Sequence, residues 1–210
     1  MMRILIADDH AVVREGVKRI LTTVGESIVV GEAGSGQELL TKATAEKWDV
    51  VMLDISMPGR NGLDVLRQLK SMCPLLPVLV FSMHPENQYA VRAFKAGAAG
   101  YLTKESIPEE LVTAIRKVIQ GRRYVSPALA EHLADAVAHP LSAPLHASLS
   151  DRELQVLCLL ASGKTVTEIA AELSLSVKTV STHRSRTLEK MHMKTNAELI
   201  HYAFWQRLVD

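Results

Sequence analysis

Polar residues stand directly after four short apolar runs in the first half of the sequence. Two acids follow the first run, and later runs are followed by an acid, a hydroxyl and an amine. These residues are Asp8, Asp9, Asp54, Ser82 and Lys104. Carboxylates crowded together repel by roughly 4 kcal/mol per pair at an effective dielectric constant near 20, so the group needs a cation. Because the donors are oxygens, without histidine or cysteine in ligand spacing, we expect a hard ion such as Mg²⁺.

These residues meet only if the apolar runs are strands of one parallel sheet. The runs are continuous and rich in β-branched residues, which is typical of strands buried on both faces. They are Ile4–Ala7, Ile28–Val30, Val50–Leu53, Val78–Phe81 and Gly100–Leu102, and helical patterns cover about 11–23, 36–46, 62–72, 86–96 and 107–120. The alternation predicts a flavodoxin-like α/β fold with a five-stranded parallel sheet in the order 2-1-3-4-5. Ligands bind beyond the carboxyl ends of such strands.

Two other uses of such a sheet are disfavoured by the residues at this edge. A nucleotide-binding protein should offer glycine and backbone amides to a phosphate after the first strand, whereas Asp8 and Asp9 would repel it. An aspartate-nucleophile phosphatase usually carries a second acid two residues after the nucleophile. Here that residue is Ser56, so the general acid is missing.

Residues 1–121 resemble a response-regulator receiver domain. The resemblance rests on Asp8, Asp9, Asp54, Ser82 and Lys104 in combination. It implies that Asp54 accepts a phosphoryl group from a sensor histidine kinase, and that Ser82 and Lys104 contact this group. A carboxylate is a competent nucleophile for such a transfer. One departure is Glu105, since the family often has proline there, and a cis peptide bond would cost more without proline.

The same resemblance implies a metal site and a switch residue. Mg²⁺ would be held by Asp8, Asp9, Asp54 and the backbone carbonyl of Ser56. Tyr101 stands three residues before the lysine, at the position of the family's switch aromatic. The alternative for Tyr101 is a plain packing role at the edge of the sheet.

The character of the sequence changes after residue 121. Ser126 followed by proline predicts a short helix over Pro127–Ala138, and the residues around Pro140 and Pro144 read as an extended hinge. We expect residues 122–148 to form a linker with this short helix. Residues 149–210 then show four purely helical patterns, the first opened by a capping box of Ser150 and Glu153. They predict a separate all-α domain.

The third of these helical patterns is suited to bind DNA. Residues 177–194 hold five basic residues and one acid, interspersed with hydroxyls, although residues 149–210 have a net charge of only +1. A short helix over Thr167–Leu173 and a tight turn precede this segment, as in a helix-turn-helix. A solvated amphipathic helix is the alternative. We expect a single buried stripe on the long helix, formed by Val177, Val180, Leu188 and Met191.

Residues 149–210 resemble the LuxR-type output domain of the NarL/FixJ response regulators. The match covers Leu149–Glu153, Thr167–Ala170 and Val177–His183. The resemblance implies DNA contacts from Lys178, Thr179, Ser181, Thr182, Arg184, Ser185, Arg186 and Lys190, of which Ser181, Thr182 and Ser185 fall where the family reads bases. His183 is open between packing and a phosphate contact. The last helix would dimerise on DNA through Leu199, Ile200 and Ala203.

The sequence therefore predicts a two-component response regulator rather than an enzyme. It would bind double-stranded DNA as a homodimer and regulate transcription. We expect a cytoplasmic protein without a membrane partner, since no stretch approaches the roughly 20 apolar residues of a membrane span. Cys73 and Cys158 are expected to be free thiols. Two alternatives stay open: a regulator of this fold that works without phosphate, and an enzyme on a receiver-type sheet.

Overall fold

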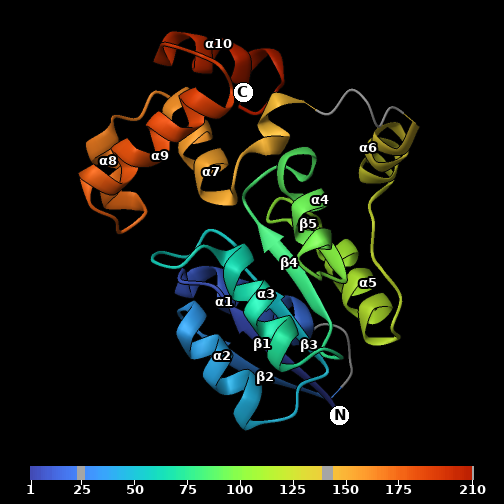
Figure 1. Cartoon of the computed structure of the whole chain (residues 1–210). Helices are drawn as coiled ribbons and strands as arrows, with labels where there is room; N and C mark the ends of the chain where they lie inside the picture. Colours follow the sequence, from blue (N-terminus) through green and yellow to red (C-terminus); the bar gives the residue numbers. More distant parts are fainter. Residues whose placement is uncertain (23–26, 139–143, 210) are drawn as a thin grey trace. The chain divides into compact units, whose positions relative to one another are not determined.

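The computed structural model describes residues 1–22, 27–138 and 144–209 (Figure 1). The predicted hinge at Pro140 and the predicted end of the first helix at Thr23 lie outside these residues. The chain divides into two compact units, Met1–Leu133 and Ala134–Asp210.

The first unit alternates strands and helices as the sequence predicts. Its strands are β1 (Met2–Ala7), β2 (Ile28–Ala33), β3 (Val50–Leu53), β4 (Val78–Ser82) and β5 (Gly100–Thr103). Its helices are α1 (Ala11–Thr22), α2 (Gly36–Ala45), α3 (Gly62–Met72), α4 (Glu86–Lys95) and α5 (Pro108–Ile119), and α6 (Pro127–Ala138) begins in it. Helix bounds differ from those predicted by about one residue, because helix ends depend on local caps.

The five strands are parallel and lie in the order β2-β1-β3-β4-β5, which confirms the predicted sheet. Their register aligns the carboxyl ends: Ala7 lies opposite both Ala33 and Leu53, and Ser82 lies opposite Thr103. The residues that follow these strands are therefore brought to one edge. Peptide bonds in the described residues are all trans, including the one before Glu105.

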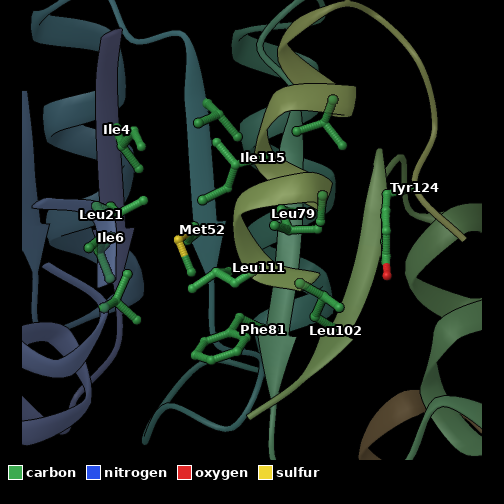
Figure 2. Close-up of a cluster of buried hydrophobic side chains, with 14 residues drawn as sticks. Ile4, Ile6, Leu21, Met52, Leu79, Phe81, Leu102, Leu111, Ile115 and Tyr124 are labelled. Carbon is green, nitrogen blue, oxygen red and sulfur yellow. The ribbon is translucent and has the colours of Figure 1, made fainter. Parts of the chain in front are cut away.

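Side chains alternate between the two faces of this sheet, and helices cover both. Ile4 and Ile6 of β1 join a core with α1 and α5, whereas Leu5 between them is buried on the opposite face. Figure 2 shows Leu111 and Ile115 of α5 directed at the strands within this core. Because both faces are covered, the strands read as continuous apolar runs.

The first unit continues beyond residue 121, where the predicted linker begins. Tyr124 is buried and pairs with Gly100 of β5 through a parallel bridge. Its hydroxyl donates to Glu110 Oε1 at 2.5 Å. Leu129 in the first turn of α6 is also buried. The start of the predicted linker is thus packed on the first unit.

The second unit is helical. It contains the short 3-10 helix η2 (Leu145–Ser148) and the helices α7 (Asp151–Ala161), α8 (Val166–Glu172), α9 (Val177–Lys190) and α10 (Asn196–Trp205). Helices α8 and α9 pack on α7 through Val156, Ile169 and Val180. The order of helix, turn and longer helix over α8 and α9 is the predicted helix-turn-helix arrangement.

The predicted buried stripe of α9 is confirmed at Val180 and Met191, whereas Leu188 is only half-buried and Val177 is not buried. Val177 is 48% exposed, whereas Thr187 is fully buried. Val177 is the first residue after the N-cap Ser176, where the chain enters the helix from the turn. Thr187 tolerates burial because its hydroxyl donates to the carbonyl of His183 at 2.9 Å.

The predicted capping box at the start of α7 is confirmed, and it is joined by an ion pair. Ser150 Oγ accepts from the amide of Glu153, and Glu153 Oε2 accepts from the amide of Ser150. Lys190 Nζ lies 2.7 Å from the same Oε2. Burial opposes ionisation of Glu153, but the hydrogen bonds from Lys190 and Ser150 outweigh it and lower the pKa of this carboxyl. Lys190, predicted to contact DNA, thus binds the end of α9 to α7.

Replacing Glu153 with Gln should destabilise the second unit by about 1–2 kcal/mol at pH 7, because the capping amide stays while the charge is lost. The folded pKa lies below the ordinary 4.5, so the loss should persist down to about pH 5 and shrink below that. Urea unfolding followed by Trp205 fluorescence in a Trp48→Phe background measures it. A pH-independent loss would contradict the ion pair.

The matched control is Glu172→Gln. Glu172 pairs with Lys164, and both side chains are about 40% exposed. Such an exposed pair contributes less than about 1 kcal/mol. An equal loss of unfolding free energy in both variants would show that burial of Glu153 does not strengthen its ion pair.

Candidate functional site

Three carboxylates converge beyond β1 and β3. The backbone places them: the amide of Asp8 donates to the carbonyl of Ala33, and that of Asp54 donates to the carbonyl of Ala7. Asp8 and Asp54 are buried. One ligand atom each from Asp8, Asp9, His10 and Asp54 lie within 4.8 Å of one another. The sheet therefore gathers the predicted acids in one place.

This donor set suits a divalent cation. Asp9 Oδ1 is buried and accepts no hydrogen bond from the described residues. The Nδ1 atom of His10 lies 3.1 Å from this oxygen, and the contact is an ion pair only when the imidazole is protonated. A buried carboxylate oxygen without a donor is costly, and a cation would satisfy it. The predicted oxygen site is thus matched by Asp8, Asp9 and Asp54.

Lys104 lies against the same carboxylates. Its Nζ is 2.6 Å from Asp8 Oδ2 and 2.7 Å from Asp54 Oδ2. The backbone amide of Lys104 donates to the carbonyl of Ser82, which extends the pairing of β4 and β5 and fixes where the side chain starts. Burial would lower the pKa of the Lys104 ammonium, but Asp54 and Asp8 outweigh this and raise it. The ammonium of Lys104 therefore stays protonated and provides a positive charge beside Asp54.

Two serines complete the surroundings of Asp54. The backbone amide of Ser56 donates to Asp54 Oδ1 at 2.8 Å, and this hydrogen bond fixes the orientation of the carboxylate. Ser82 is fully buried, and its Oγ lies 3.3 Å from Ser56 Oγ. The amide of His84 donates to the same Ser82 Oγ at 3.2 Å. Ser82 thus connects the acidic cluster to the loop before α4.

Tyr101 is fully buried and points toward this loop. Its hydroxyl donates to the carbonyl of His84 at 2.8 Å. Burial raises the pKa of the phenol, so the hydroxyl stays neutral and able to donate. The imidazole of His84 stacks on Tyr89 with ring centroids 4.4 Å apart. Tyr101 and Ser82 therefore hold the same residue, one at its carbonyl and the other at its amide.

Two residues at the cluster were missed by sequence reasoning. His10 adds an imidazole nitrogen to the carboxylates. Arg14 Nη1 donates to the carbonyl of Asp8 at 2.6 Å, and its Nε pairs with Glu32 on β2. A single histidine has no ligand spacing to recognise, so only its place beside Asp9 could have indicated it. Arg14 lies on the first turn of α1, and the sequence does not show that its side chain reaches back to the carbonyl of Asp8.

The predicted DNA-contact residues all lie on α9 but differ in exposure. Lys178, Thr182, Ser185 and Arg186 are exposed. Thr179, Ser181 and Arg184 are half-buried. Two hydroxyls are engaged within the helix, since Thr179 Oγ1 lies 2.8 Å from the N-cap Ser176 Oγ and Thr182 Oγ1 donates to the carbonyl of Lys178. The exposed residues recur at helical spacing and form one face.

His183 and Arg184 lie closer to the core of the unit. Burial and then the charge of Arg152 lower the pKa of His183. The ring nitrogen Nδ1 of His183 and the Nε of Arg184 are buried without a hydrogen-bond partner among the described residues. Both side chains therefore pack partly inward, and the face of α9 left to a ligand is narrower than predicted.

Two of the three predicted dimerisation residues are buried within the second unit. Leu199 and Ala203 are fully buried in the core of the second unit, where α10 packs on α7. Ile200 is half-buried. Phe204 is 48% exposed and Trp205 is 74% exposed. Since α10 has apolar residues on two sides, the sequence did not decide which side packs inward.

Across the described ranges, no helix is both long and apolar enough to cross a lipid bilayer.

Comparisons with known proteins agree with both halves of the chain. Residues 4–116 match the response regulator receiver domain, and residues 147–203 match the luxR family of bacterial regulatory proteins. Response regulator GacA of Pseudomonas aeruginosa is 40% identical over 212 residues, covering 100% of this chain and 99% of that protein. Response regulator UvrY of Escherichia coli K12 is 38% identical over 205 residues, covering 97% and 94%.

A solved structure is similar over nearly the whole chain. It is RcsB from Salmonella enterica serovar Typhimurium bound to promoter rprA with the phosphomimetic BeF3⁻, with a TM-score of 0.65 and 26% identity over 96% of this chain and 97% of that one. The two matched families thus lie in one chain, and the similar regulators extend over both. This chain belongs to the NarL/FixJ family of two-component response regulators, with a receiver domain and a LuxR-type DNA-binding domain.

Proposed function

We propose that Asp54 accepts a phosphoryl group from a sensor histidine kinase in a Mg²⁺-dependent transfer, and that the chain then regulates transcription by binding DNA as a dimer. The observation that carries the first half is the setting of Asp54. Its carboxylate is buried, oriented by the amide of Ser56 and neutralised by Lys104. Placement of a nucleophile beside fixed positive charge is what phosphoryl transfer requires.

In the transfer, an Asp54 carboxylate oxygen forms a bond to phosphorus while the bond from phosphorus to the kinase histidine breaks. Lys104 neutralises charge on the phosphoryl oxygens, and the amide of Ser56 keeps the carboxylate in its orientation. Mg²⁺ would be held by Asp8, Asp9, Asp54 and the carbonyl of Ser56, and it supplies further charge neutralisation. The buried Asp9 Oδ1 without a donor supports this ligand set.

Exposed apolar side chains near the acidic cluster favour a protein as the phosphate donor. Val12, Met83 and Ile107 are 85%, 63% and 62% exposed. Each lies within three residues of a polar residue of the site. Apolar side chains around a polar centre are typical of protein interfaces.

Asp54→Asn should abolish phosphorylation by acetyl phosphate with Mg²⁺, since an amide oxygen is a poor nucleophile and the variant removes a metal ligand. Phosphate-affinity electrophoresis measures the labelled fraction. The control Asp64→Asn changes an exposed acid that pairs with Arg67, and it should label like wild type. Equal labelling of the Asp54 variant would remove Asp54 as the acceptor.

The second half of the proposal rests on the exposed face of α9. Lys178 and Arg186 offer charges for phosphates, and Ser185 and Thr182 lie between them on the same side of the helix. Acids are sparse there, since Glu189 is the one acid on α9. The promoter complex of RcsB supports duplex DNA as the ligand.

Lys178→Ala should lower the slope of log affinity against log salt by about 0.9, because one phosphate contact is lost. Ser185→Ala should leave that slope unchanged and weaken only the specific site, by about 1–3 kcal/mol. Titrations of a bound promoter fragment at several salt concentrations separate the two. Lys164→Ala is the control, since Lys164 pairs with Glu172 away from α9. Unchanged slopes in the Lys178 variant would exclude this face.

For the dimer, the exposed part of α10 replaces the predicted residues. Ile200, His201, Phe204 and Trp205 are available at its surface, and the two aromatic rings offer most of the apolar area. Two copies of this face could bury each other's rings on adjacent half-sites. Trp205 is the candidate anchor because it is the most exposed of the three apolar side chains.

Trp205→Ala should weaken dimerisation about tenfold or more, because a central aromatic residue carries much of an interface. Sedimentation equilibrium of the phosphorylated protein, with and without DNA, measures it. The control Leu75→Ala removes an apolar side chain that is even more exposed but lies outside α10. A dimer of unchanged strength in the Trp205 variant would rule out this face.

A further inference from the structure

The first turn of α6 is attached to the receiver by a hydroxyl with two roles. Ser126 is buried, and its Oγ accepts from the amide of Leu129 at 3.1 Å, which caps the helix. The same hydroxyl donates to the carboxylate of Glu86, the first residue of α4. Ser126 therefore both starts α6 and ties it to α4. We call Glu86, Ser126 and Leu129 the α6 latch.

The apolar part of the latch is Leu129. Its side chain is fully buried, while Pro127, Ala128 and Ala130 around it are exposed. One residue of the turn is thus inserted and the rest face solvent. A turn held by one apolar side chain and one shared hydroxyl has few contacts to lose, so a small displacement of its docking site can release it.

Hydrogen bonds lead from Asp54 to His84 in the loop before α4. Asp54 Oδ1 accepts from the amide of Ser56, whose hydroxyl lies 3.3 Å from Ser82 Oγ. Ser82 Oγ accepts from the amide of His84. These three contacts form a continuous path from Asp54 through the two serines to His84. The path ends two residues before Glu86.

Both backbone polar groups of His84, its amide and its carbonyl, are hydrogen-bonded to side chains. Ser82 accepts from its amide, and Tyr101 donates to its carbonyl. Pro85, the N-cap of α4, separates His84 from Glu86. Because the proline ring fixes φ, one of the two backbone rotations that could absorb a shift of His84 is removed, which favours passing the shift on to Glu86.

We propose that the α6 latch is closed in the unphosphorylated receiver and opens when Asp54 carries phosphate. The inference rests on the proposed phosphorylation of Asp54. The Ser82 side chain turns to donate to a phosphoryl oxygen, and this rotation carries its Oγ away from the amide of His84. The carboxylate of Glu86 then moves away from Ser126, and the first turn of α6 leaves the receiver. Phosphate thereby changes where the linker to the DNA-binding domain begins.

The latch itself is tested without phosphate. In the full chain, Glu86→Ala and Ser126→Ala should each speed hydrogen exchange of the Leu129 amide about fivefold, the size of a lost helix cap. The double variant should show much less than the product of both effects, because the two residues share one bond. Glu109→Ala is the control, an exposed acid in the first turn of α5. Ser126→Asn keeps a cap and a donor and should restore protection.

Coupling is tested by adding acetyl phosphate and Mg²⁺ while the phosphorylated fraction is measured on the same samples. Exchange at Leu129 should rise in wild type to the rate of the Glu86 variant, and that variant should not respond further. Wild-type rates in Glu86→Ala would overturn the latch. Full phosphorylation with unchanged exchange at Leu129 would overturn the coupling. If wild type takes up no phosphate, the proposed function fails, and the coupling with it.

Discussion

The contact between Lys104 and the carboxylates of Asp8 and Asp54 is the interaction on which the receiver depends. Without the ammonium, the strand ends would bring buried acids together with no side-chain charge of the sheet to balance Asp8 and Asp54. Strands β1 and β3 pair directly and β5 joins them through β4, so the sheet register delivers all three side chains and also sets their charge balance. The same ammonium lies where a phosphoryl group on Asp54 would need positive charge.

The fold was largely predictable because its signals are local. Continuous apolar runs gave the strands, and the residues after them gave the site, since parallel strands share an edge. The contact between Glu153 and Lys190 joins residues 37 apart, and the one between Glu86 and Ser126 joins residues 40 apart. No spacing in the sequence indicates such pairs. They depend on how finished elements pack.

The errors have a common physical source, which is the choice among alternative faces of a helix. On α10, Leu199 and Phe204 are both apolar, but only the first packs into the core. On α9, Val177 was expected to be buried. It is the first residue of the helix, where the preceding turn, and not the helical repeat, sets the direction of the side chain. Thr187 took the inner place because its hydroxyl finds a carbonyl one turn away.

The packing of Tyr124 on β5 and of Ser126 on α4 has a consequence for how such chains are recombined. With the buried Leu129, these residues extend the packed receiver into the first turn of α6, beyond the last residue of α5. A chimera joined at Gly121 would lose the bridge to Gly100 and the hydrogen bond from Ser126 to Glu86. A junction placed after the first turn of α6 keeps both, so an unrelated output domain can be grafted there without cutting into the receiver.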